Sequence, residues 1–201
     1  MRIGIVVEGS NAEAGDVHAI RAICNKIATE HNIARQCIVI AGGSKPAIIQ
    51  GAAEFVKALK AKGCTRVVIV WDNCPPWTGN MDVDAFVSAA RAWRRILGSG
   101  QLTNDVYMVC ARRELEAWIL TDETAIKAVL SDLGKQKMPS ISGSKKPDTI
   151  DKPKDRLQNY WYLKCNTTPS GKNYCDMFEL ANITKLRRSP SFCRLEDIIS
   201  R

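Results

Sequence analysis

Motifs that mark several large classes of protein are missing from this sequence. No apolar run approaches the roughly 18 residues that a membrane-spanning helix needs, and the run at residues 3–7 is too short for a signal peptide. Neither glycine-rich phosphate-binding pattern, G-x-G-x-x-G or G-x-x-x-x-G-K-[ST], occurs. We therefore expect a cytoplasmic protein without a membrane partner. A nucleotide-binding or nucleotide-processing protein is a weak alternative.

Histidine is scarce, with two residues in 201, and the eight cysteines form no C-x-x-C pair. Structural zinc sites usually bring such pairs or a histidine pair together at short spacing, so a zinc site is poorly supported. Several cysteines, such as Cys37 and Cys110, lie inside apolar runs, where cysteine behaves as a small hydrophobic residue. We expect reduced, buried thiols.

Positive charge is concentrated in the C-terminal third of the chain. Residues 1–134 carry a net charge of +1, whereas residues 135–201 carry +7. This imbalance favours a polyanion as partner, with DNA expected before RNA. The alternative is a soluble surface that happens to be rich in lysine.

Apolar runs alternate with segments of helical periodicity over the first 131 residues. The runs predict buried strands at 2–7, 35–41, 65–72 and 105–111, and helices are expected from Asp16, over 48–59, over 83–97 and from about 114. Asp16 is taken as a helix N-cap, and Asp122 as the cap of a separate helix that starts at Glu123. The pattern predicts an α/β fold, a mostly parallel four-stranded sheet with helices on both faces.

The composition changes after about residue 131. Residues 132–157 are rich in lysine, proline and serine and predict a basic loop or arm, and residues 158–201 predict a mainly helical extension packed on the α/β core at 1–131. Three aromatic residues, at 160–162, could stack on bases. Apolar cover for the sheet is the preferred interpretation.

Acidic residues follow three of the predicted strands. Glu8 follows the first, Asp72 ends the third, and Glu114 and Glu116 follow the fourth. Parallel strands end at one edge of the sheet, which is where ligands bind in such folds. Carboxylates there suit Mg²⁺ or Mn²⁺, so we predict Glu8, Asp72 and Glu114 as metal ligands and all four acids as catalytic. Each acid, taken alone, is also compatible with an ordinary turn or cap residue.

Basic residues near this edge and in the arm are candidates for contacts with a phosphate backbone. The candidates are Arg112, Arg113, Lys145, Lys146, Lys152, Lys154 and Arg156. A solvated loop is the alternative interpretation of the arm.

Short motifs throughout the chain resemble a known group of proteins. "VVEG" after the first strand, "VIVWDN" after the third, "ELEAWIL" after the fourth, and the later "PKDRL", "YLK" and "SPSFCRL" resemble the Toprim-like proteins, in particular an uncharacterised bacterial and archaeal branch. The resemblance implies a Rossmann-like Toprim fold with Glu8 and Asp72 binding divalent metal. It also implies action on nucleic-acid phosphodiesters and a partner ATPase in loci resembling phage-defence operons. Assembly into a homodimer is left open.

One position departs from the pattern of these proteins. Cys74 stands where they carry a second aspartate, and a soft sulfur is a poor ligand for Mg²⁺. Their second glutamate is also displaced here, so that Glu13 or Asp16 could fill its place.

Despite these departures, the acidic residues and the resemblance lead us to expect a Mg²⁺-dependent nuclease of a defence or DNA-processing system. The alternative is a catalytically degenerate nucleic-acid-binding or adaptor subunit of a partner ATPase.

Overall fold

The computed structural model describes residues 1–72, 105–134 and 136–201 of the chain. The helix expected at 83–97 and the position of Cys74 lie outside these residues. Within them, no helix is both long enough and apolar enough to cross a membrane.

Four parallel strands form the centre of the fold. They are β1 (Arg2–Val7), β2 (Gln36–Ala41), β3 (Cys64–Asp72) and β4 (Val106–Ala111), in the spatial order β2-β1-β3-β4. Every pairing is parallel, which confirms the predicted sheet. The strands are mostly apolar because both faces of the sheet are covered.

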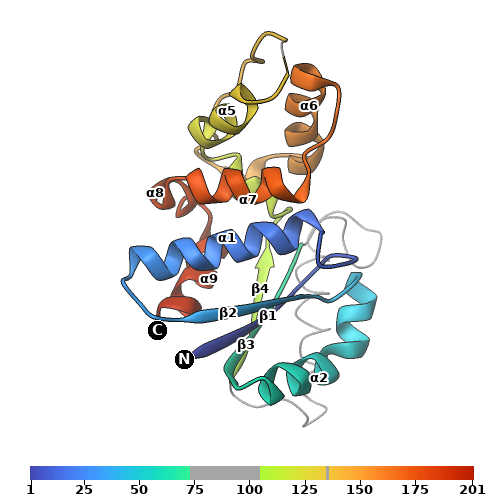
Figure 1. Ribbon diagram of the computed structural model, residues 1–201, viewed down its shortest axis with the longest axis vertical. Helices are drawn as coiled ribbons and strands as arrows, with labels where there is room; N and C mark the ends of the chain where they lie inside the picture. The colour runs from blue at the N-terminus through green and yellow to red at the C-terminus, as the bar shows by residue number, and fades with distance from the viewer. Residues whose placement is uncertain (73–104, 135) are drawn as a thin grey trace.

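Alternate residues of the strands enter two separate hydrophobic clusters. Ile3, Ile5 and Val7 of β1 face the cluster built with α1 (Gly15–Glu30) and the C-terminal helices. Val6 faces the other cluster, which includes α2 (Lys45–Ala61). Helices therefore lie on both faces, as Figure 1 shows with α1 and α2 on opposite sides of the strands.

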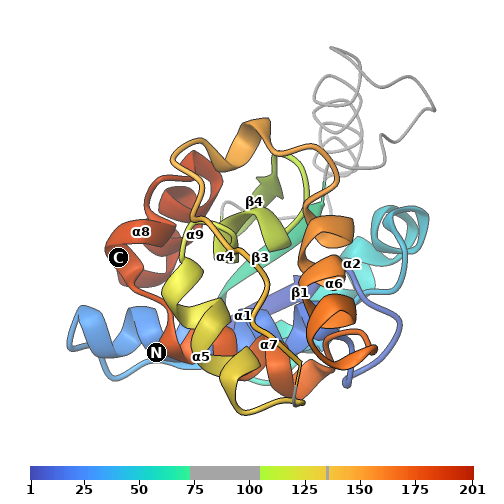
Figure 2. The ribbon, with the colours of Figure 1, turned by 90° about the horizontal axis from the view of Figure 1, so that it is seen from above.

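A helical region extends from the carboxyl edge of the sheet. It consists of α4 (Glu116–Ile119), α5 (Glu123–Ser131), the 3-10 turn η1 (Pro147–Thr149), α6 (Pro153–Cys165), α7 (Gly171–Leu180) and α8 (Ile183–Leu186), whereas the last helix, α9 (Pro190–Ser200), lies on the sheet beside β4 and α1. The predicted helical extension is thus present, with α7 packed along α1 and α9 against β4. Figure 2 looks onto this region from above, with α5, α6 and α7 in front of the strands.

The loop between α5 and α6 is folded against the helical region. Ile141 and Ile150 are buried in the core, and the Ser144 amide donates a 2.8 Å hydrogen bond to the Leu120 carbonyl. The aromatic residues that follow are divided between core and surface. Trp161 and Tyr160 are buried, as expected for apolar cover, whereas Tyr162 is 62% exposed.

Candidate functional site

Glu8 and Asp72 lie side by side because β1 and β3 are neighbouring strands. The Asp72 amide donates to Glu8 Oε2 at 3.4 Å, and the Lys45 ammonium, at the start of α2, lies 3.9 Å from the same oxygen. Gly9 exchanges two backbone hydrogen bonds with Gly43, which ties the turn after β1 to the turn after β2. These contacts hold Glu8 at the carboxyl edge, where the sequence placed it.

The segment after β4 returns to the same place. The Leu115 amide donates a 2.8 Å hydrogen bond to Asp72 Oδ1, so the backbone between Glu114 and Glu116 is fixed to the end of β3. This contact brings the third acidic segment to the edge formed by the first two.

Glu114 also supports the start of α6. Its Oε2 accepts a 2.7 Å hydrogen bond from the Lys154 amide. The N-cap residue of α6, Lys152, has left-handed backbone (φ 45°) and makes no side-chain cap bond. Because the first amides of a helix have no acceptor within the helix, Glu114 supplies from another segment the acceptor that a cap would provide.

Glu116 is the most buried of the acids at this edge, at 1% exposure. Its Oε1 accepts a 2.6 Å hydrogen bond from the hydroxyl of Tyr174, on α7. Its Oε2 is buried and has no hydrogen-bond partner among the residues that the structure describes. Only one of the two carboxylate oxygens of Glu116 is thus hydrogen-bonded among the described residues.

Asp16 joins the other acids, and its predicted role as a helix cap is wrong. The N-cap of α1 is Ala14, and Asp16 lies in the first turn of the helix. Helix α1 begins at Gly15, one residue before Asp16, so the Asp16 side chain lies inside the first turn and not at the N-cap position. Burial, followed by the charge of Glu116, raises the pKa of Asp16 to about 7. We call the five acids the acidic site: Glu8, Asp16, Asp72, Glu114 and Glu116.

The members of the acidic site disfavour each other's ionisation. The pKa of Asp72 is well above its ordinary value because the carboxyl is buried and because Asp16 and Glu116 lie nearby. Burial likewise raises the pKa of Glu8 and of Glu114. Concentrated negative charge of this kind, at the ligand-binding edge of an α/β sheet, is typical of functional sites.

Lys154 is the basic side chain most affected by these acids. Partial desolvation opposes the charged form, but the nearby carboxylates together, Glu116 and Asp16 first among them, outweigh that effect and raise its pKa. The sequence assigned Lys154 to a nucleic-acid contact in the arm, whereas the structure places it beside the carboxylates. A phosphate that approached the acidic site would meet this ammonium group.

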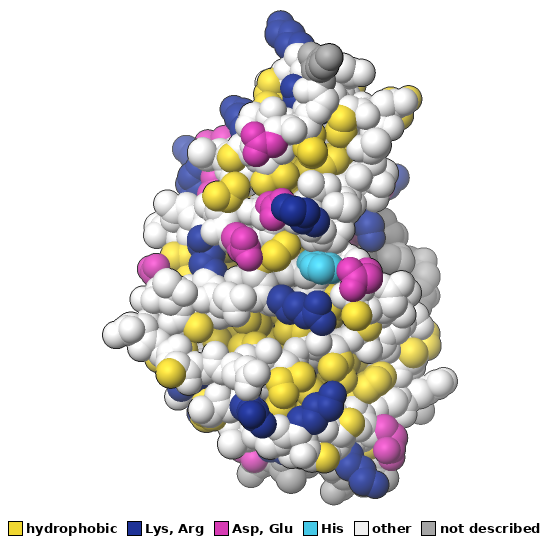
Figure 3. Space-filling view, in the orientation of Figure 1, with side chains coloured by type: hydrophobic (Ala, Val, Ile, Leu, Met, Phe, Trp, Pro, Cys, Tyr) yellow, Lys and Arg dark blue, Asp and Glu magenta, His cyan; other side chains and the backbone are white. Residues whose placement is uncertain are grey.

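The other predicted basic residues lie mostly at the surface. Arg112, Lys145, Lys146 and Lys152 are exposed, and Arg113 is half-buried. Arg156 donates from Nε to the hydroxyl of Tyr160 at 3.0 Å. On the face drawn in Figure 3, basic and acidic side chains of the described residues are interspersed, so this face does not present a uniformly basic surface.

The carboxylates of the acidic site suit a hard divalent cation, although they are not arranged as a complete metal-coordination site. Among the described residues, no three Asp, Glu, His or Cys side chains converge as a ready-made metal centre. Mg²⁺ is commonly held by only one or two carboxylates, with water and substrate completing its shell. The buried, unpartnered Oε2 of Glu116 is a donor of the required type, so the residues present fit such an ion.

Tyr174 escaped the sequence analysis, and Asp16 was recognised only in part. Asp16 was assigned to a cap because it precedes a periodic apolar stretch, with a place beside Glu8 offered only as an alternative by the family resemblance, and Tyr174 carried no signal of its own. Its inward helical position with Met177 and Phe178 does predict a buried tyrosine, whose hydroxyl usually has a partner. Nothing local identifies that partner as Glu116, which is 58 residues away.

Fold and site together define a class, an α/β protein with a buried acidic site at the carboxyl edge of a parallel sheet. The chain belongs to the family described as Domain of unknown function (DUF4276), which it matches over residues 7–199. Comparison with curated proteins gives no match, and comparison with solved structures gives none.

Proposed function

We propose that this protein is a divalent-cation-dependent enzyme that cleaves nucleic-acid phosphodiester bonds, with DNA as the first substrate. The observation that carries the proposal is the grouping of five acidic residues from four segments, with Lys45 and Lys154 beside them, at the edge where α/β sheets bind ligands. The basic C-terminal third supports a polyanionic substrate. The resemblance to Toprim-like proteins supports the same chemistry and a partner ATPase in a defence or DNA-processing system.

Individual residues have separable roles in this proposal. Glu8, Asp72 and Glu114 would hold Mg²⁺ or Mn²⁺, which supplies charge stabilisation of the phosphoryl group and an activated water. Asp16, with a pKa of about 7, can accept or release a proton near neutral pH. The Lys154 ammonium group is placed to orient a phosphate oxygen.

A non-catalytic role is the second candidate. It is favoured by the absence of a ready-made group of three ligands among the described residues and by the use of Glu114 to support α6. In that case the protein would bind nucleic acid as an adaptor of a partner ATPase without cleaving it.

One assay separates the two candidates. Pure protein is incubated with plasmid, single-stranded DNA and RNA in Mg²⁺ or Mn²⁺, beside the variants Glu8→Gln and Asp72→Asn. Both substitutions keep the oxygens that accept from the Asp72 and Leu115 amides, so the local fold is preserved. We expect cleavage by the wild type and a loss of at least 100-fold in both variants.

The matched control is Asp105→Asn, which alters an exposed acid that pairs with Lys60 just before β4, at the opposite edge of the sheet. It should cleave like the wild type. Cleavage that survives both site substitutions would exclude the acidic site. Binding that weakens with salt, without cleavage, would support the adaptor.

A further inference from the structure

The two oxygens of Glu116 have different surroundings. Oε1 receives the Tyr174 hydroxyl at 2.6 Å, whereas Oε2 is buried without a hydrogen-bond partner among the described residues. An unpartnered buried carboxylate oxygen is unfavourable, because its lost hydration is not replaced. Such an atom therefore marks a place where a donor or a cation is expected.

Oε2 belongs to the acidic site rather than to an isolated part of the core. Among charged neighbours, Glu116 has the largest effect on both Asp16 and Lys154, and it also acts on Asp72. The carboxylate thus lies among the other acids, close to the lysine that partly balances them.

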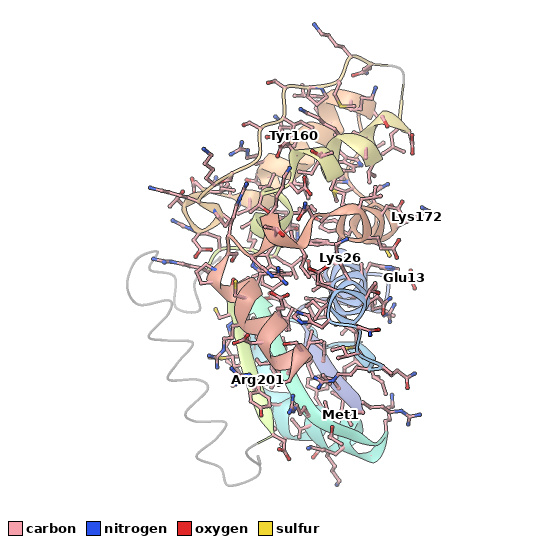
Figure 4. All side chains as sticks on the ribbon, turned by 90° about the vertical axis from the view of Figure 1, so that its left-hand side faces the viewer. Met1, Glu13, Lys26, Tyr160, Lys172 and Arg201 are labelled. Carbon is pink, nitrogen blue, oxygen red and sulfur yellow. The ribbon has the colours of Figure 1, made fainter. Side chains whose placement is uncertain are left out.

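The position of Tyr174 is fixed by close packing of α7 on α1. A Cβ atom on Gly15 would lie 2.8 Å from Cδ2 of the tyrosine ring, so glycine at that position allows the ring to approach the start of α1. Further along α1, the Lys26 ammonium donates to the Glu179 carbonyl of α7 at 2.7 Å. Lys26 is labelled in Figure 4. The hydroxyl of Tyr174 is therefore held against Glu116 by two helices.

Tyr174 can act only as a donor to Glu116 at ordinary pH. Burial, together with the charge of Glu116, raises the pKa of the phenol well above its usual range. The hydroxyl keeps its proton and directs it to Oε1.

We propose that Glu116 is a further ligand of the divalent cation, binding it through Oε2, and that Tyr174 is the positioning residue that holds Oε1. This inference rests on the cation-binding part of the proposed function. It adds a ligand that reaches the site from α4 and a positioning residue from α7, both beyond the three ligands expected from the strand ends.

The test measures Mn²⁺ and Mg²⁺ affinity by isothermal titration calorimetry on the full chain, without nucleic acid. Tyr174→Phe removes only the hydroxyl, and loss of a positioning partner of a ligand typically weakens metal binding about 10–100-fold. We expect a loss in that range for Tyr174→Phe and at least as large a loss for Glu116→Gln. Circular dichroism and thermal unfolding in EDTA establish that each variant is folded.

Tyr160→Phe is the matched control. It also removes the hydroxyl of a buried tyrosine, one that accepts from Arg156 instead of contacting an acid. Its Mn²⁺ affinity should stay within about twofold of the wild type, because its hydroxyl bonds to Arg156 and not to a proposed ligand. If Tyr174 served only to join α7 to α4, its loss would lower the melting temperature and leave Mn²⁺ affinity unchanged.

Unchanged affinity in folded Tyr174→Phe and Glu116→Gln, or no cation binding by the wild type, overturns the inference. The cleavage assay is independent of this result. Wild-type protein that cleaves DNA while both variants bind Mn²⁺ normally refutes the inference alone. Protein that binds Mn²⁺ in the expected order but cleaves no nucleic acid supports the inference and refutes the proposed activity.

Discussion

Single residues of the acidic site reduce the stability of the free protein. Asp16 has a pKa of about 7 in the folded chain, against an ordinary value of 3.8. The folded state therefore binds more protons than the unfolded state between these values, so this group makes stability fall as pH rises through that window. The destabilisation is complete above about pH 7 and absent below about pH 4.

Replacing Asp16 by asparagine should remove this pH dependence. We expect Asp16→Asn to raise the free energy of unfolding by roughly 1–2 kcal/mol at pH 8 and to change it little at pH 4. Urea denaturation in EDTA at the two pH values measures the difference.

Asp176→Asn is the control for that measurement. Asp176 lies on α7 and pairs with the exposed Lys172 at 2.6 Å, outside the acidic site. Exposed pairs of this kind contribute little, so stability should change by less than about 0.5 kcal/mol at either pH. A variant of Asp16 that is equally destabilised at pH 4 and pH 8 would contradict the electrostatic explanation.

At the scale of elements, the sequence was informative wherever the signal was local. Unbroken apolar runs predicted all four strands, and parallel topology then brought Glu8 and Asp72 to one edge. The role of Asp122 was also predicted, because a cap needs only its own helix. Its side chain accepts from the Thr124 amide at the start of α5.

Contacts between distant segments could not be read from those patterns. The hydrogen bond from Tyr174 to Glu116 depends on how α7 packs against α1, and the support of α6 by Glu114 depends on the path of the loop before it. Lys154 was assigned to phosphate binding from composition alone. Its place beside the acids follows from the position at which α6 begins.

Asp122 illustrates how one cap can join two elements. Besides the Thr124 amide, it accepts from the Asn182 amide at 2.7 Å and from the Lys185 ammonium at 2.9 Å, both at α8. Asp122→Ala should lower the free energy of unfolding by roughly 2–3 kcal/mol, because a cap and a charge-assisted bond are lost together. Thermal or urea unfolding at pH 7 measures it.

Asp122→Asn is the comparison variant that separates the cap from the charge. Its amide oxygen can still accept from one backbone amide, but its charge toward Lys185 is gone, so it should be intermediate in stability. Equal stability of the alanine variant and the wild type would show that α5 and α8 are held by their apolar contacts alone.

The whole molecule gathers negative charge from four segments, spread from Glu8 to Glu116 along the chain. Lys45 and Lys154 balance this charge only in part, so a divalent cation that binds the folded state should stabilise it. At a concentration 100 times its Kd the gain is about 2.7 kcal/mol. For a chain of this length that is a rise in Tm of roughly 5–10 °C. Scanning calorimetry with Mn²⁺ and with EDTA measures it.

The size of this effect should depend on pH and on the acids. Protons compete with the cation for raised-pKa carboxyls, so the rise should be larger at pH 8 than at pH 6. Asp72→Asn should reduce it and Asp105→Asn should not. An equal rise in Tm for both variants would place the cation elsewhere on the protein.

Glu114 gives the acidic site a mechanical connection to the basic loop. Its Oε2 atom accepts the Lys154 amide, at the point where the loop becomes α6. Drawing that oxygen toward a cation would leave the amide without its acceptor, at a cost of roughly 1–3 kcal/mol. If the proposed cation binds through Glu114 Oε2, occupancy of the acidic site and the start of α6 would be coupled through this hydrogen bond.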